Sequence, residues 1–169
     1  DFAVANDGSG PPPGPDTLTV AYGDGTGLFP TTVSLSLVGG DGGPLSVTGA
    51  DFDGDGDVDL ATAAFLTDTL SVFENVGSGF SAAPDRIAAP DFAVFVTAAD
   101  LNRDGKADLA AVAAGLKVLR SKGSLALSSP FEDAEDFVAG VSPGFAVFGD
   151  WNRDGWPDAA VVNDGSNDV

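Results

Sequence analysis

Asp51-Phe52-Asp53-Gly54-Asp55-Gly56-Asp57-Val58-Asp59 is the stretch of sequence that decides the fold. It places five aspartates in nine positions, with Gly56 between them. Carboxylates this close repel one another unless a cation lies among them, and Ca²⁺ takes six to eight oxygen ligands in short flexible loops. We therefore expect residues 51–59 to form a cation-binding loop, with Gly56 allowing the sharp turn that such a loop needs.

The same pattern occurs twice more, at residues 100–108 and 150–158. The shared skeleton is D-x-[DN]-x-D-G-x-x-D, and the first aspartates of successive copies are 49 and 50 residues apart (51 to 100 and 100 to 150). Repeat periods of this size are typical of β-propellers and solenoids. Three copies at nearly equal spacing predict a repeat protein, because chance would not place three acidic turns in register.

Each loop offers the same oxygen donors at its odd-numbered positions. Positions one, three, five and nine provide side chains, and position seven provides its main-chain carbonyl. Use of the carbonyl explains why position seven varies freely between loops. We predict about three Ca²⁺ ions, one per complete loop. The predicted ligands are Asp51, Asp53, Asp55, Asp57, Asp59, Asp100, Asn102, Asp104, Lys106, Asp108, Asp150, Asn152, Asp154, Trp156 and Asp158.

An EF-hand loop is the obvious alternative, and the sequence excludes it. An EF-hand needs a bidentate Glu at position twelve and a helix on each side. Position twelve here is Thr62, Ala111 or Val161, and each lies in an apolar, strand-like run. A dockerin-type loop fails the same test. The predicted site is therefore a strand–loop–strand unit that closes at position nine.

The segments between the loops have the pattern of short strands. After the first loop come residues 60–65, 70–75, 80–88 and 92–98, separated by Gly, Asp, Ser and Pro. Four such strands per period fit one blade of a β-propeller, and no long stretch has helical periodicity. We predict an all-β fold of antiparallel four-stranded blades, with a two-sheet sandwich as the alternative. The whole chain, 1–169, forms one propeller segment, with repeats at approximately 1–58, 59–107 and 108–157 and the start of a further repeat at 158–169.

The first residues of the chain fit the same scheme. The segment from Asp1 to Asn6 resembles the segment from Asp158 to Asn163, so Asp1 is expected to correspond to the last ligand of a loop. About three blades leave two apolar faces open, because a propeller needs about four to eight blades to protect its edges. We therefore expect the remaining blades to come from the same chain or from a homo-oligomer.

Composition excludes several classes of function. The formal net charge of −19 argues against nucleic acid or an anionic membrane as a partner. The absence of His removes the commonest general base, and the absence of Cys removes disulfides. No apolar run is long enough to predict a transmembrane helix. We therefore expect a protein that is not an enzyme, binds no nucleic acid and does not insert into a membrane.

The loops and their flanking phrases resemble the FG-GAP/VCBS repeat family of calcium-loop β-propellers, which includes the integrin α head. The resemblance is carried by Phe148-Gly149-Asp150, by Asp59-Leu60-Ala61, by Asp108-Leu109-Ala110 and by the phrase from Asp1 to Asn6. It implies a larger propeller of about seven blades, structural calcium, and an extracellular or cell-surface location.

The expected function is that of a calcium-binding extracellular or cell-surface module for adhesion, protein binding or scaffolding, with a protein or glycan as its ligand. Two alternatives are a carbohydrate-binding lectin and the non-catalytic propeller part of a secreted polysaccharide-degrading enzyme. Trp156 is the candidate ligand-binding residue, because an exposed indole can stack on a sugar or a partner surface; the alternative is that it packs on a neighbouring blade or chain. Trp151 is expected to be a packing residue instead, since position two of every loop is apolar.

Overall fold

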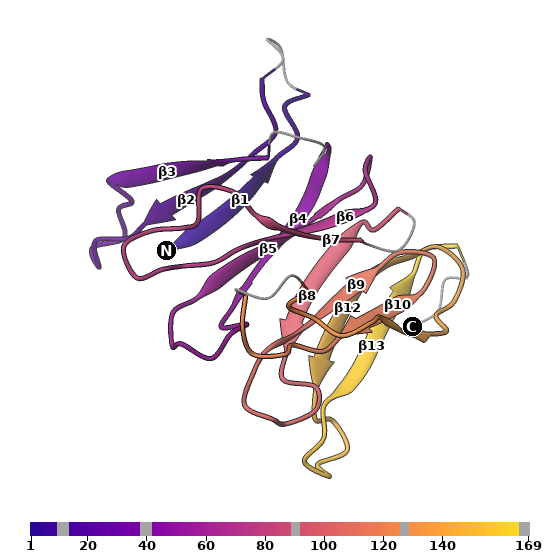
Figure 1. The fold of residues 1–169 in the computed structure, drawn as a ribbon. Coiled ribbons are helices and arrows are strands. Elements are labelled where there is room, and N and C mark those ends of the chain that lie inside the picture. Colours follow the sequence, from indigo (N-terminus) through magenta and orange to yellow (C-terminus); the bar gives the residue numbers. More distant parts are fainter. Residues whose placement is uncertain (10–13, 38–41, 89–91, 126–128, 166–169) are drawn as a thin grey trace.

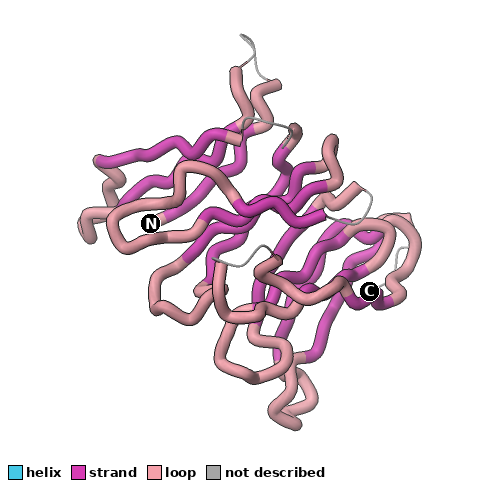
Figure 2. The backbone as a smooth tube through the Cα atoms, in the orientation of Figure 1, coloured by secondary structure: helices cyan, strands magenta, loops and turns pink. Residues whose placement is uncertain are grey.

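The computed structural model describes residues 1–9, 14–37, 42–88, 92–125 and 129–165, and within these ranges it contains strands and no helix (Figures 1 and 2). The all-β prediction is therefore confirmed. The part of the predicted further repeat at 166–169 lies outside the described residues. The strands are β1 (Phe2–Asn6), β2 (Thr17–Tyr22), β3 (Thr31–Ser36), β4 (Pro44–Ala50), β5 (Asp59–Ala64), β6 (Thr69–Phe73), β7 (Asp85–Ala88), β8 (Phe95–Ala99), β9 (Asp108–Val112), β10 (Leu116–Leu119), β11 (Glu135–Phe137), β12 (Pro143–Gly149) and β13 (Asp158–Asn163).

The strands form four antiparallel sheets that follow one another along the chain (Figure 1). Their orders are β1-β2-β3, β4-β5-β6-β7, β8-β9-β10-β11 and β12-β13. Successive sheets pack on one another, with β1 against β4, β4 against β8, and β12 against β8 and β9. The described sheets do not close into a ring, so the number of blades and the propeller arrangement stay predictions.

One prediction about the sheets was wrong. The segment at 92–98 was expected to supply the fourth strand of the sheet that contains β5. Its strand, β8, instead pairs with β9, and β4 completes the sheet by pairing with β5. The physical reason is that each acidic loop folds the chain back on itself, so the strands on either side of the loop become antiparallel neighbours. The second, third and fourth sheets therefore each begin one strand before the final aspartate of their loop.

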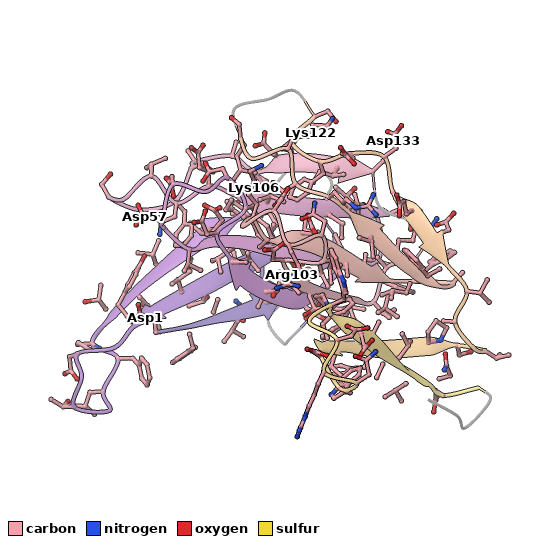
Figure 3. All side chains as sticks on the ribbon, turned by 90° about the horizontal axis from the view of Figure 1, so that it is seen from below. Asp1, Asp57, Arg103, Lys106, Lys122 and Asp133 are labelled. Carbon is pink, nitrogen blue, oxygen red and sulfur yellow. The ribbon has the colours of Figure 1, made fainter. Side chains whose placement is uncertain are left out.

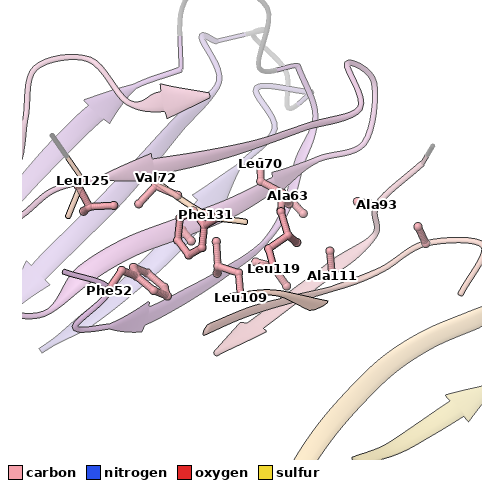
Figure 4. Packing of buried hydrophobic residues seen from close by; sticks show 13 residues of the cluster. Phe52, Ala63, Leu70, Val72, Ala93, Leu109, Ala111, Leu119, Leu125 and Phe131 are labelled. Carbon is pink, nitrogen blue, oxygen red and sulfur yellow. The ribbon is translucent and has the colours of Figure 1, made fainter. Parts of the chain in front are cut away.

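The layers between the sheets are apolar. All six residues of β5 are buried, because a sheet packs on each of its faces. Side chains on a strand alternate between its two faces, so Leu60 packs toward the first sheet and Ala61 toward the third. The layer between the second and third sheets is the largest (Figure 4), and it includes Phe52, Ala63, Leu70, Val72, Ala93, Leu109, Ala111, Leu119, Leu125 and Phe131.

Candidate metal centre

Three acidic loops each connect the first two strands of a sheet. Loop one (residues 51–59) joins β4 to β5, loop two (100–108) joins β8 to β9, and loop three (150–158) joins β12 to β13. All three lie along the lower edge of the molecule in Figure 1. The hairpins therefore present the predicted ligands in equivalent places on successive sheets.

The three loops share one backbone conformation. The glycine at position six is left-handed in each, with φ of 95°, 87° and 88°. Position four is also left-handed, with φ of 82° at Gly54, 62° at Arg103 and 64° at Arg153. This conformation costs about 1–2 kcal/mol for a residue with a Cβ. Sequence reasoning identified position six and missed position four, because Gly54 was the sole signal there and the other loops carry arginine.

The first aspartate of each loop organises the backbone. Asp51 accepts hydrogen bonds from the N–H groups of Gly54 and Gly56, at 2.6 and 3.0 Å. Asp100 and Asp150 each accept two N–H groups from the same part of their loops. A carboxylate oxygen has about two lone pairs, so an oxygen that accepts one N–H can still bind a cation. The loops are thus curled with their acidic groups held in place.

Three carboxylates converge in loop one. One oxygen from each of Asp51, Asp53 and Asp59 lies within 4.8 Å of the others. Burial, followed by the charges of Asp55 and Asp51, raises the pKa of Asp53. A hard divalent cation would relieve this repulsion and use the same oxygens as ligands. An all-oxygen donor set on a short loop therefore fits Ca²⁺ in its chemistry.

Loops two and three hold the same shape with less negative charge. Among the described residues, loop one holds the one trio of acidic side chains whose oxygens lie within 4.8 Å of one another. Position three is an asparagine in both loop two and loop three. Asn102 donates a hydrogen bond to Asp104 at 3.1 Å, and Asn152 donates one to Asp154 at 3.0 Å. The amide oxygen of each asparagine would supply the ligand that a carboxylate supplies in loop one.

The final aspartate is the most buried acidic residue of its loop. Asp59 is fully buried, and its two oxygens accept the N–H groups of Phe52 at 3.0 Å and Asn75 at 2.8 Å. Burial raises the pKa of Asp59 to about 6. Asp108 is equally buried, has the equivalent pair of bonds, and its pKa is also raised by burial. These carboxylates connect the loops to the interior of their sheets.

Asp158 and Asp1 have the same geometry in part. Asp158 accepts the N–H of Trp151 at 3.0 Å, as the other final aspartates do from position two. Asp1 accepts the N–H of Gly23 at 2.7 Å, which corresponds to the bond between Asp59 and Asn75. The position of Asp1 at the start of β1 is therefore that of a final aspartate at the start of β5 or β9.

Position seven donates its N–H to the position-five carboxylate in every loop, at 2.8–3.0 Å. The side chain at position seven differs between the loops: it is Asp57 in loop one, Lys106 in loop two (both labelled in Figure 3) and Trp156 in loop three. Trp156 is 53% exposed, and the guanidinium of Arg103 lies over its ring at 5.3 Å from the centroid. Loop two thus covers part of the indole that was predicted to bind a ligand.

Trp151 was expected to be a packing residue, and in the described structure its indole lies against Gly149 while about half of the side chain stays exposed. Phe52, its counterpart in loop one, is fully buried, whereas Trp151 is 55% exposed. The reason is that Phe52 is covered by the following sheet, where the ring of Phe131 meets it edge to face at 5.8 Å. The described residues contain no sheet that follows β12 and β13.

Loops one and two are joined by hydrogen bonds. The N–H of Ala107 donates to the carbonyl of Asp51 at 3.2 Å, and the hydroxyl of Ser121 donates to the carbonyl of Phe52. Ser121 also donates its N–H to Asp108 at 2.9 Å. One residue therefore contacts the final aspartate of loop two and the backbone of loop one.

An acidic segment, residues 132–136, follows β10. Two of its carboxylates are in ion pairs, Asp136 with Lys117 and Glu135 with Arg120. The first pair joins β11 to β10 and the second joins β11 to the residue that follows β10, so these side chains support the outer strand of the third sheet.

Residues 1–62 match the family model described as the FG-GAP-like repeat, a non-catalytic structural repeat that is often found in extracellular proteins. No curated protein matches the chain. In the described ranges there is no helix long and apolar enough to cross a membrane. The matched part includes β1 to β4, all of loop one and the start of β5. The family resemblance that the sequence predicted is thereby confirmed: over residues 1–62, the chain is similar to the FG-GAP-like repeat.

Proposed function

We propose that loops one, two and three each bind one Ca²⁺ ion, and that the chain forms blades of a calcium-stabilised β-propeller. The observation that carries the proposal is the convergence of Asp51, Asp53 and Asp59 in a loop whose backbone shape recurs twice. Ca²⁺ favours carboxylate, amide and carbonyl oxygens on loops that can adjust their geometry. Bound Ca²⁺ would supply the positive charge that lets these carboxylates lie together.

The packing of the sheets supports the propeller. The first strands of successive sheets, β4, β8 and β12, contact one another in chain order, and equivalent hairpins carry equivalent loops. A propeller repeats one four-stranded sheet in this way around a central axis. The remaining blades would come from the same polypeptide or from further copies.

The proposed Ca²⁺ of loop one would stabilise the fold through Asp59. Asp59 extends from loop one into the second sheet, where the N–H of Asn75, two residues after the end of β6, donates to its second oxygen. A ligand attached to the sheet interior transmits the order of the loop to the strands, so binding free energy adds to folding free energy. The protein would then act as an extracellular or cell-surface module for adhesion, protein binding or scaffolding.

Thermal unfolding with and without chelator tests the metal assignment. We expect chelation to lower the melting temperature, and Ca²⁺ to restore it better than Mg²⁺, which requires stricter octahedral geometry. Substituting the first aspartate of each loop (Asp51→Asn, Asp100→Asn, Asp150→Asn) should abolish the calcium dependence.

A matched control removes three exposed carboxylates outside the loops (Asp7→Asn, Asp133→Asn, Asp164→Asn). This variant loses the same formal charge and should keep the full calcium response. A melting temperature that does not change on chelation of the unsubstituted protein would contradict the assignment.

A carbohydrate-binding function is the second candidate, and the half-exposed ring of Trp156 favours it. Stacking on the uncovered part of the indole would hold a sugar beside loop three. A glycan array would show reproducible binding that Trp156→Ala abolishes. Trp151→Ala is the matched control, because Trp151 is equally exposed in the same loop. An array without any bound glycan would contradict the carbohydrate-binding candidate.

A further inference from the structure

Loop two bonds to loop one at the residue where the predicted ligands of loop one begin. Ala107 lies between two predicted ligands of loop two, Lys106 and Asp108. Its N–H donates to the carbonyl of Asp51, the first predicted ligand of loop one, at 3.2 Å. An ordered backbone at positions seven to nine of loop two therefore also holds the backbone at position one of loop one.

A second connection joins the final aspartates of the two loops. Asp59, the final aspartate of loop one, accepts the N–H of Phe52 at 3.0 Å. The carbonyl of Phe52 accepts the hydroxyl of Ser121. The N–H of Ser121 in turn donates to Asp108, the final aspartate of loop two, at 2.9 Å. These four residues are all buried, so a continuous chain of buried hydrogen bonds runs from one final carboxylate to the other.

The hydroxyl of Ser121 is held in place from several sides. Its oxygen accepts the N–H of Gly123 at 2.9 Å, which leaves its hydrogen for the carbonyl of Phe52. Ser121 also forms a β-bridge with Phe131, and the ring of Phe131 meets that of Phe52 edge to face at 5.8 Å (Figure 4). Because a protein interior is closely packed, one final aspartate cannot shift without breaking this chain of bonds or moving the other.

We propose that loops one and two bind Ca²⁺ cooperatively, so that binding in either loop raises the affinity of the other. The inference rests on the proposed binding of calcium by these loops. Ordering a loop around a cation costs conformational entropy. Once one loop is ordered, the bonds at Asp51 and Ser121 hold part of the other loop in place, so the second binding event has less to order.

Loop three shows how one of these connections can be removed without changing a ligand. Its position eight is Pro157, which has no N–H and cannot make the bond that Ala107 makes. Loops two and three have nearly the same backbone, with φ of 62° and 64° at position four and 87° and 88° at position six. Proline therefore fits position eight of this loop shape, and Ala107→Pro deletes one bond between the loops while keeping every predicted ligand.

Amide hydrogen exchange of the metal-stripped protein, titrated with Ca²⁺ and read separately for peptides from each loop, tests the proposal. Asp51→Asn with Asp53→Asn removes two carboxylates from loop one. We expect the Ca²⁺ concentration that half-protects loop two to rise at least about fivefold in this variant. Because coupling between sites is reciprocal, Asp100→Asn with Asp104→Asn should raise the midpoint of loop one by the same factor.

The contribution of charge is separated by a second pair of variants. Loss of two carboxylates from one loop also weakens the attraction of the neighbouring loop for a cation. The same comparison is therefore repeated in proteins that carry Ala107→Pro or Ser121→Ala, since neither substitution changes a charge. The midpoint shift should shrink in both. Ala107 is only partly buried, so Ala107→Pro keeps the test available if Ser121→Ala disturbs folding.

Two results would overturn the cooperativity and leave the calcium assignment intact. One is a midpoint for loop two that stays the same when loop one loses its carboxylates. The other is a midpoint shift of equal size with and without the bonds from Ala107 and Ser121. Absence of Ca²⁺-dependent protection in both loops of the unsubstituted protein would overturn the cooperativity and the calcium assignment together.

Discussion

The junction between loops one and two differs from the junction between loops two and three. At the first, Ala107 and Ser121 donate hydrogen bonds to two consecutive carbonyls of loop one. At the second, Pro157 occupies the position of Ala107 and has no N–H to donate. Arg103 of loop two instead lies over the ring of Trp156 in loop three.

This difference shows what the variable positions of the loop motif do. The aspartates and the glycine set the shape of each loop, and that shape is the same in all three. Contacts between neighbouring loops and sheets come from the variable positions: Phe52 with Phe131, Ala107 with Asp51, and Arg103 with Trp156. We therefore expect substitutions at these positions to affect the two junctions unequally.

The largest difference is expected at position two. Phe52→Ala removes a fully buried ring from the layer between the second and third sheets and should cost about 3–5 kcal/mol of unfolding free energy. Trp151→Ala should cost less than about 1 kcal/mol, because half of that side chain is in water. Urea denaturation of both variants measures the two values. Similar losses would show that position two has the same surroundings in both loops.

Stability of the metal-free protein should depend on the protonation of Asp59. Burial raises its pKa in the folded state to about 6, above the value of about 3.8 for the unfolded chain, so the folded state binds the proton more tightly. The unfolding free energy should therefore fall as pH rises from about 4 to 6, by at most about 3 kcal/mol from this residue. Asp108, with its pKa also raised by burial, acts in the same direction.

Asp59→Asn provides the control for this pH dependence, because the amide does not titrate. Denaturant unfolding between pH 4 and 6 in the presence of chelator should show a shallower decline for the variant than for the unsubstituted protein. If the two proteins decline in parallel, Asp59 does not carry the effect.

The hydrogen bonds at the first junction should have a moderate effect. Ser121→Ala leaves the buried carbonyl of Phe52 without its donor and is expected to cost about 1–3 kcal/mol. Ser34→Ala is a suitable comparison, since Ser34 is an exposed serine on β3. An equal and small change in both variants would indicate that Ser121 does not join the sheets.

The smallest difference is expected at position four. Arg153→Gly should stabilise the protein by up to about 1 kcal/mol, because glycine adopts the left-handed conformation without strain. Arg103→Gly gains the same relief and loses the contact with Trp156, so its net change should be close to zero. Melting temperatures of the two variants, measured side by side, test whether the stacked pair contributes.

The sequence predicted the loops and the all-β class because both follow from local chemistry. Clustered aspartates around a glycine define one turn geometry, and short apolar runs between turn residues define strands. The resemblance to the FG-GAP-like repeat followed from the same residues, and the family model matches over residues 1–62.

The features that the sequence did not predict depend on contacts between distant residues. Ser121 bonds to a carbonyl 69 positions earlier, and no local pattern indicates that contact. The membership of β8 in the third sheet depends on how a loop folds back, and the exposure of Trp151 depends on whether another sheet covers it. The left-handed conformation of Arg103 and Arg153 at position four became visible when the backbones of the three loops were compared.

Counting the bound ions tests the central claim most directly. Calorimetric titration of the metal-stripped protein with Ca²⁺ should give about three ions per chain, one for each loop, and Asp51→Asn with Asp53→Asn should lower the count by one. A count of zero, or a count that these loop-one substitutions leave unchanged, would contradict the account.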